Sequence, residues 1–86
     1  MPEISRFYGI VIKMYFGDHP PPHFHAEYAE HAVVVDIRTL SIISGSFPPR
    51  AMGLVAEWAL LRQDELLDFW KSAERLEPLG KIDPLP

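Results

Sequence analysis

Apolar and polar residues alternate along much of the first half of the chain, a pattern typical of half-buried β-strands. The pattern predicts strands over about residues 4–16, 23–28, 32–38 and 41–45. Gly9 interrupts the first of these and is expected to mark a bulge or a close backbone approach. Because the connections are too short for parallel crossovers, we expect one antiparallel sheet of three or four strands over about residues 4–45.

The two middle strands can be aligned by matching their apolar faces, with Ala29 and Glu30 as the turn residues. This register pairs Phe24 with Val35, Ala26 with Val33, His25 with Val34, and His23 with Asp36. A shift by one residue would turn every apolar side chain to the other face, so the pattern determines the register. Asp36 is therefore expected beside His23, where it orients the ring or forms an ordinary cross-strand pair worth roughly 0.2–1 kcal/mol.

The second half of the chain has helical spacing. Apolar residues recur every three to four positions over about residues 49–76, which predicts a long C-terminal helix packed on the sheet. Trp58 lies on the apolar side and is expected in the core. Arg62 interrupts that side. Either the helix breaks near residues 63–64, with Asp64 capping a second helix, or Arg62 lies over the sheet as a functional charge.

Leu60 and Leu67 fall on the opposite side of a continuous helix, and Met52 and Trp70 lie near the edge of the apolar side. The four residues are expected either to form a partner surface or to be ordinary scattered exposed apolar residues. Residues 77–86 contain three prolines and predict an extended tail that packs on its own domain or on a partner. The predicted fold class is α+β, an antiparallel sheet packed against a long C-terminal helix or a helix pair.

Composition restricts the classes of function. A chain of 86 residues predicts a single domain over residues 1–86. There is no cysteine, which excludes disulfides and thiolate ligands and favours a cytoplasmic location. The net charge is −4 and no basic stripe is present, so we expect no nucleic-acid binding without a partner. No apolar run approaches the ~20 residues that cross a bilayer, so we expect no membrane partner.

The most unusual stretch, residues 19–27, contains three of the four histidines and three consecutive prolines. The prolines favour a stiff, extended connection that holds His19 near the following strand. Alternation then places His23, His25 and Glu27 on one strand face. The candidate ligands of a divalent transition metal are His19, His23, His25 and Glu27, with Asp36 and Arg62 as supporting residues. His23 and His25 are also candidate acid–base catalysts, and a solvated polar strand face is the alternative without chemistry.

Three blocks of sequence carry a resemblance to a known family: residues 4–10, the stretch from Asp18 to Ala26, and residues 57–59. They resemble the landmarks of short prokaryotic proteins catalogued as domain of unknown function 4160. The resemblance implies a gene often paired with that of another small protein, reminiscent of toxin–antitoxin pairs, and implies no catalytic residues. In many relatives a His follows the position of Leu61, where this chain has Arg62, which weakens the metal interpretation.

Two functional hypotheses follow from these observations. The first is a small cytoplasmic interaction module, which binds a small protein partner or itself and is one member of a toxin–antitoxin-like pair. The alternative is a metal-binding or acid–base enzyme, for example an RNA-cleaving one, which uses the histidine cluster. No cofactor other than a divalent transition metal is indicated.

Overall fold

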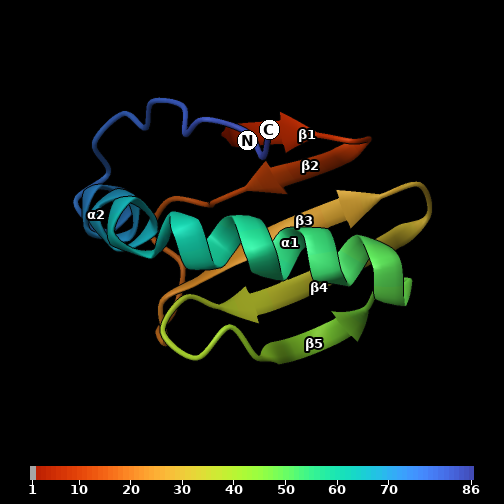
Figure 1. Ribbon diagram of the computed structural model, residues 1–86. Coiled ribbons are helices and arrows are strands. Elements are labelled where there is room, and N and C mark those ends of the chain that lie inside the picture. The colour runs from red at the N-terminus through yellow and green to blue at the C-terminus, as the bar shows by residue number, and fades with distance from the viewer. Residues whose placement is uncertain (1) are drawn as a thin grey trace.

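The computed structural model describes residues 2–86 and has an α+β architecture (Figure 1). Five antiparallel strands form one sheet in chain order: β1 (Glu3–Phe7), β2 (Ile10–Lys13), β3 (His23–Tyr28), β4 (His31–Asp36) and β5 (Ile42–Ser46). Two helices follow, α1 (Pro49–Leu61) and α2 (Gln63–Glu74). The predicted antiparallel sheet and C-terminal helix pair are confirmed, whereas the expected number of strands was too low.

The additional strand arises because residues 4–16 form a β-hairpin instead of one strand. Tyr8 and Gly9 make its turn, with φ angles of 51° and 80°, and Phe7 pairs with Ile10 across it. Two successive residues with positive φ are typical of tight hairpin turns, whose twist matches that of the strands. Gly9 is therefore a turn residue, and the expectation of a bulge there was wrong. Apolar alternation continues on both sides of the turn, so it does not reveal the reversal.

The predicted register between β3 and β4 is confirmed. Residues 29–30 form the turn, and the pairs are Phe24 with Val35, Ala26 with Val33, His25 with Val34, and His23 with Asp36. Phe24, Ala26, Val33 and Val35 are all buried. The burial of this apolar set fixes the register, because any shift by one residue would expose all four side chains to water.

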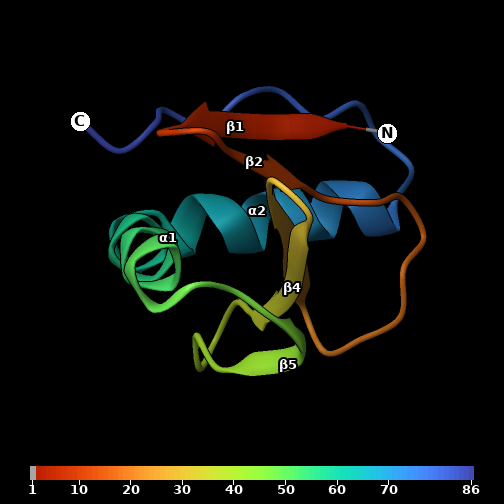
Figure 2. The ribbon, with the colours of Figure 1, turned by 90° about the vertical axis from the view of Figure 1, so that its right-hand side faces the viewer.

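Helix α1 covers one face of the sheet, and α2 lies across the end of the sheet where β3 begins (Figures 1 and 2). Trp58 is fully buried, as expected, and its ring lies 5.3 Å from that of Phe7 and 5.8 Å from that of Phe24. The indole therefore joins α1 to both β1 and β3.

The helical segment breaks at Arg62, whose φ of −117° and ψ of 16° are not helical. A break was one of the two predicted alternatives, but Asp64 does not cap α2, which begins at Gln63 without a side-chain cap. The Gln63 side chain instead donates hydrogen bonds to the carbonyl oxygens of Ile37 and Arg38, at 2.9 and 3.2 Å. These bonds tie the break to the loop after β4.

Helix α2 buries a side that includes Trp70. Trp70 is buried together with Leu66 and Ala73, so the expectation that Trp70 belongs to a partner surface was wrong. Trp70 lies four residues after Leu66 and three before Ala73, so the three side chains share one face of the helix. Leu60 is 65% exposed, as expected for a residue outside the packed side.

The C-terminal tail packs on its own chain, which was one of the two predicted alternatives. Ile82 is buried, and its N–H donates to the carbonyl oxygen of Ile4 in β1 at 2.7 Å. The indole N–H of Trp58 donates to the carbonyl oxygen of Asp83 at 2.8 Å. The tail therefore runs beside β1, so that the C-terminus lies near this edge of the sheet (Figure 1).

Candidate metal centre

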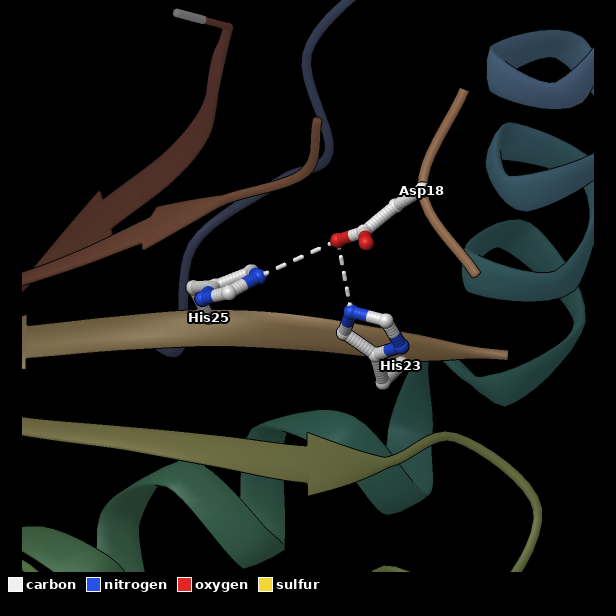
Figure 3. A group of neighbouring side chains, drawn as sticks. All are labelled: Asp18, His23 and His25. Atoms are coloured by element: carbon white, nitrogen blue, oxygen red, sulfur yellow. Dashed lines mark hydrogen bonds and ion pairs between the residues drawn. The ribbon is translucent and has the colours of Figure 1, made fainter. Parts of the chain in front are cut away.

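Asp18, His23 and His25 converge at the start of β3 (Figure 3). One donor atom from each residue can be chosen so that all three lie within 4.8 Å of one another. The common point is Oδ2 of Asp18, which lies 2.8 Å from Nε2 of His23 and 3.5 Å from Nε2 of His25. Two imidazoles and one carboxylate thus surround one small volume.

The two histidines come from β3 and the aspartate from the loop before it. His23 and His25 are two residues apart in a strand, so both project from the same face, as predicted. The strand alone supplies no third ligand at this position, because the next residue on that face, Glu27, lies roughly 6.6 Å further along. The loop folds back and places Asp18 beside both rings.

Backbone hydrogen bonds hold the loop at both ends. Near its start, the N–H of Gly17 donates to the carbonyl oxygen of Ala73 in α2 at 3.2 Å. At its end, the carbonyl oxygen of Pro22 accepts from Ile37 at 2.9 Å. Between them the chain bends at residues 20–21, so the three prolines do not follow the single extended path that was expected.

His23 is the most buried member of the site, with only 8% of its surface exposed. Its ring packs against that of Trp70, with the centroids 5.0 Å apart. Nδ1 lies 2.8 Å from the carbonyl oxygen of Pro21, and Nε2 lies 2.8 Å from the carboxylate of Asp18. Both partners are acceptors, so a neutral ring with one N–H can satisfy only one of them.

His25 is half-buried, and its ring meets that of Tyr15 edge-on at a centroid distance of 4.5 Å. Burial lowers the pKa of His25, and the nearby His23 adds to this, although the hydrogen bond with Asp18 acts in the opposite direction. The lowered pKa favours a neutral imidazole with a free lone pair near pH 7, which is the form that binds metal ions.

Asp18 is held in its ionised form. Partial burial by itself would raise the pKa of Asp18, but hydrogen bonds from the backbone N–H of His19 and from the side chain of His23 lower it below its usual range. The His19 N–H donates to Oδ1 at 2.9 Å. This bond fixes the rotation of the carboxylate and leaves Oδ2 facing the two imidazoles.

The other sequence-predicted site residues lie outside this cluster. The side chain of His19 is exposed, and only its backbone N–H contacts Asp18. Glu27 forms an ion pair with Lys13 at 3.0 Å. Asp36 lies opposite His23 in the register, but its Oδ1 accepts the backbone N–H groups that follow it, those of Arg38 and Thr39. Arg62 contacts Glu65 at 3.4 Å.

Sequence reasoning missed Asp18 as a member of the site. A carboxylate directly before the histidine-rich stretch was a usable signal, because a loop closed by three prolines is short enough to return Asp18 to the first strand residues. Periodicity gives no information about loops, so the strand pattern could not place Asp18 relative to His25.

Comparison with known proteins identifies one family, described as Domain of unknown function (DUF4160), which matches residues 9–71. No curated protein and no solved structure matches the chain. Among the described residues 2–86, none of the helices has the length and apolar character needed to cross a membrane. The matched segment includes all three residues of the cluster and most of both helices. The chain therefore belongs to the DUF4160 family.

Proposed function

We propose that this protein binds a divalent transition-metal ion through Asp18, His23 and His25. One observation carries the proposal: both nitrogens of the buried His23 ring face acceptors, at 2.8 Å each. A cation between Nε2 and the Asp18 carboxylate removes the conflict. Nδ1–H then donates to Pro21, and the Nε2 lone pair and Oδ2 both point at the ion.

The distances between donor atoms support this proposal. Ligand atoms about 2.0–2.1 Å from a common ion lie roughly 2.9–3.4 Å from each other in octahedral or tetrahedral geometry. The Asp18 oxygen lies 2.8 and 3.5 Å from the two imidazole nitrogens. Both distances lie within a few tenths of an ångström of this range, and the three donor atoms lie within 4.8 Å of one another, so an ion would draw the two imidazoles together.

The ligand types favour particular ions. Two imidazoles and one carboxylate suit zinc, iron, nickel or copper, whereas calcium and magnesium prefer sets of oxygen ligands. The contact from His23 Nδ1 to the Pro21 carbonyl is the kind of outer hydrogen bond that orients metal-bound histidines. Three protein ligands on one side also leave coordination positions free for water or a substrate, as catalytic sites require.

A metal-free site is the competing explanation. In that case His23 carries a proton on both nitrogens and forms a charged pair with Asp18, and His25 is available as a base. This is the arrangement that an acid–base enzyme, for example an RNA-cleaving one, would use. The negative net charge of −4 opposes RNA binding by the protein alone, which favours the metal proposal.

The deciding experiment is elemental analysis of untagged protein purified without a chelator. We expect near-stoichiometric metal in the wild type and less than a tenth of it in the His23→Ala/His25→Ala double variant. The matched control is His19→Ala/His31→Ala, which also removes two imidazoles but leaves the cluster intact, and we expect it to retain the metal. Circular dichroism checks that all three proteins are folded.

The outcomes separate the alternatives. Wild-type protein that binds no zinc, nickel or iron even after incubation with each ion would overturn the metal proposal. Equal metal loss in both double variants would show that binding does not depend on the cluster. RNA cleavage that continues in the presence of a chelator but requires His23 and His25 would favour the acid–base enzyme.

A second candidate function is an interaction module, cytoplasmic and part of a toxin–antitoxin-like pair. The supporting observation is a pair of adjacent leucines at the end of α1, Leu60 and Leu61, which are 65% and 62% exposed. The test is light scattering on the protein alone and mixed with the product of the neighbouring gene. A mixture in which both proteins keep their separate masses would contradict this candidate.

A further inference from the structure

The two edges of the sheet differ in how they are covered. At the β1 edge the C-terminal tail runs alongside the strand, with the Ile82 N–H bonded to Ile4 at 2.7 Å and Lys81 Nζ bonded to the carbonyl oxygen of Glu3 at 2.6 Å. At the other edge every residue of β5 is exposed. Ile42 and Ile43 are the most apolar of these, at 46% and 48% exposure.

An open edge strand presents backbone N–H and C=O groups that can pair with another strand. Natural proteins block such edges with charges, prolines, bulges or a covering segment. Of these devices β5 has one, an irregularity in its pairing with β4 at Ile43, which falls between the paired residues Ile42 and Ser44. The strand itself contains no charge and no proline.

The charge distribution indicates what this edge can meet. Residues 39–49 are uncharged, although the chain has 20 charged side chains and a net charge of −4. Because β5 has no charged side chain, it cannot form ion pairs with a charged partner. Two copies of this acidic protein repel each other elsewhere, but they can approach without a like-charge contact at an uncharged strand.

We propose that β5 pairs with β5 of a second copy of this chain. Antiparallel pairing about a two-fold axis extends the sheet across both copies, and Ile42 and Ile43 of each copy cover apolar surface of the other. The proposal does not rest on the metal site, because none of Asp18, His23 and His25 lies in β5.

The interface is small, which sets the expected affinity. Five residues per copy, interrupted at Ile43, place the contact below the roughly 1,200 Å² of ordinary stable complexes. We therefore expect a weak dimer, with a dissociation constant on the order of 10–100 μM. Analytical ultracentrifugation of the full chain from about 5 μM to about 1 mM, in EDTA to exclude metal bridging, covers this range.

The variants locate the contact. Ile43→Lys places a charge on the edge and is expected to raise the dissociation constant at least tenfold. Ser46→Lys also places a charge on the edge, at an exposed residue that contributes nothing to the core. This second variant tests the contact even if Ile43→Lys disturbs the fold. Leu76→Lys is the matched control, since it also replaces an exposed apolar residue by lysine but lies outside β5, and we expect it to dimerise as the wild type does.

Three results would overturn the proposal. The first is a wild type that stays monomeric at about 1 mM. The second is a dimer that both folded β5 variants form as well as the wild type does. The third is a monomeric wild type that binds a different protein only when Ile43 is intact, which would assign the edge to a strand of that protein instead of a second copy.

Discussion

Replacing Asp18 by Asn is the sharpest test of the metal centre, because the change removes one charge and almost no volume. The amide oxygen still accepts the N–H of His19, which donates at 2.9 Å in the wild type. The amide NH₂ then faces Nε2 of His23, where the carboxylate oxygen lay at 2.8 Å. An amide is a poor ligand for transition metals, and even the loss of an outer hydrogen-bond partner costs 10–100-fold in affinity, so we expect a loss of more than about 100-fold.

The effect on metal-free protein is expected to be small. In the wild type a charged hydrogen bond between His23 and Asp18 contributes about 1.5–3 kcal/mol. In the variant the amide donates to neutral His23, a bond worth about 1 kcal/mol, and Nδ1–H keeps its bond to Pro21. The net loss is on the order of 1 kcal/mol, or a shift in Tm of about 4–8 °C for a domain of this size.

Zinc should widen this difference in stability between the wild type and Asp18→Asn. At a free zinc concentration 100 times Kd, binding stabilises the wild type by about 2.7 kcal/mol. This corresponds to a rise in Tm of more than about 10 °C, which Asp18→Asn should lack. Thermal unfolding followed by circular dichroism, with zinc and with EDTA, measures both quantities, and calorimetric titration gives Kd.

Asp36→Asn is the matched control, because Asp36 lies opposite His23 in the register yet binds the backbone of Arg38 and Thr39. This variant should bind zinc as the wild type does. The reasoning is refuted if Asp18→Asn gains the same zinc-dependent stability as the wild type, or if both Asp variants lose it equally.

Two further predictions concern the fold that carries the site. Gly45→Ala should lower the free energy of unfolding in urea by more than about 2 kcal/mol, because Gly45 has a φ of 81° and a Cβ there would overlap the carbonyl oxygen of Ala32. Gly53→Ala should instead stabilise the protein by about 0.5–1 kcal/mol, because Gly53 lies in α1 and no atom outside the helix's own backbone lies within 4 Å of the new Cβ. Equal effects of Gly45→Ala and Gly53→Ala on stability would contradict this reasoning. Trp58→Phe should lower the free energy of unfolding by about 2 kcal/mol or more, because it deletes the indole hydrogen bond to the Asp83 carbonyl. A variant whose unfolding in urea is unchanged would show that the tail contributes no stability through this bond.

The parts of the fold that could be predicted are those in which burial determines the answer. The register of β3 and β4 follows from the burial of Phe24, Ala26, Val33 and Val35 on one face. The turn at Tyr8 could not be found in this way, because Phe7, Tyr8 and Ile10 are all apolar and hide the change of phase that a two-residue turn introduces. Tyr8 is also an unusual residue for a positive φ. Leu66 and Ala73 lie on the apolar side of α2 as expected, whereas Trp70, expected near the edge of that side, was misplaced.

The candidate site was half predictable. His23 and His25 share a face because a strand has a period of two, and this holds whatever surrounds them. The third member depends on the path of the loop, which is determined by tertiary contacts of Gly17 with Ala73 and of Pro22 with Ile37. His19, expected near the strand because of the stiff proline connection, and Glu27, expected on the same strand face, lie outside the cluster, and Asp18 is inside it.

These tertiary contacts also indicate how the metal and the fold are related. The loop is attached to α2 and to the residue after β4, and His23 packs on Trp70, so contacts within the fold position the candidate ligands. Most core residues come from the strands and α1, among them the fully buried Trp58, whereas Trp70 of α2 belongs both to this core and to the site. In small zinc domains that are unfolded without metal, the ion supplies the folding energy. For this protein we expect the fold to persist without the ion, because contacts within the fold position the candidate ligands, so the chelated protein serves as the reference state for measuring what the ion adds.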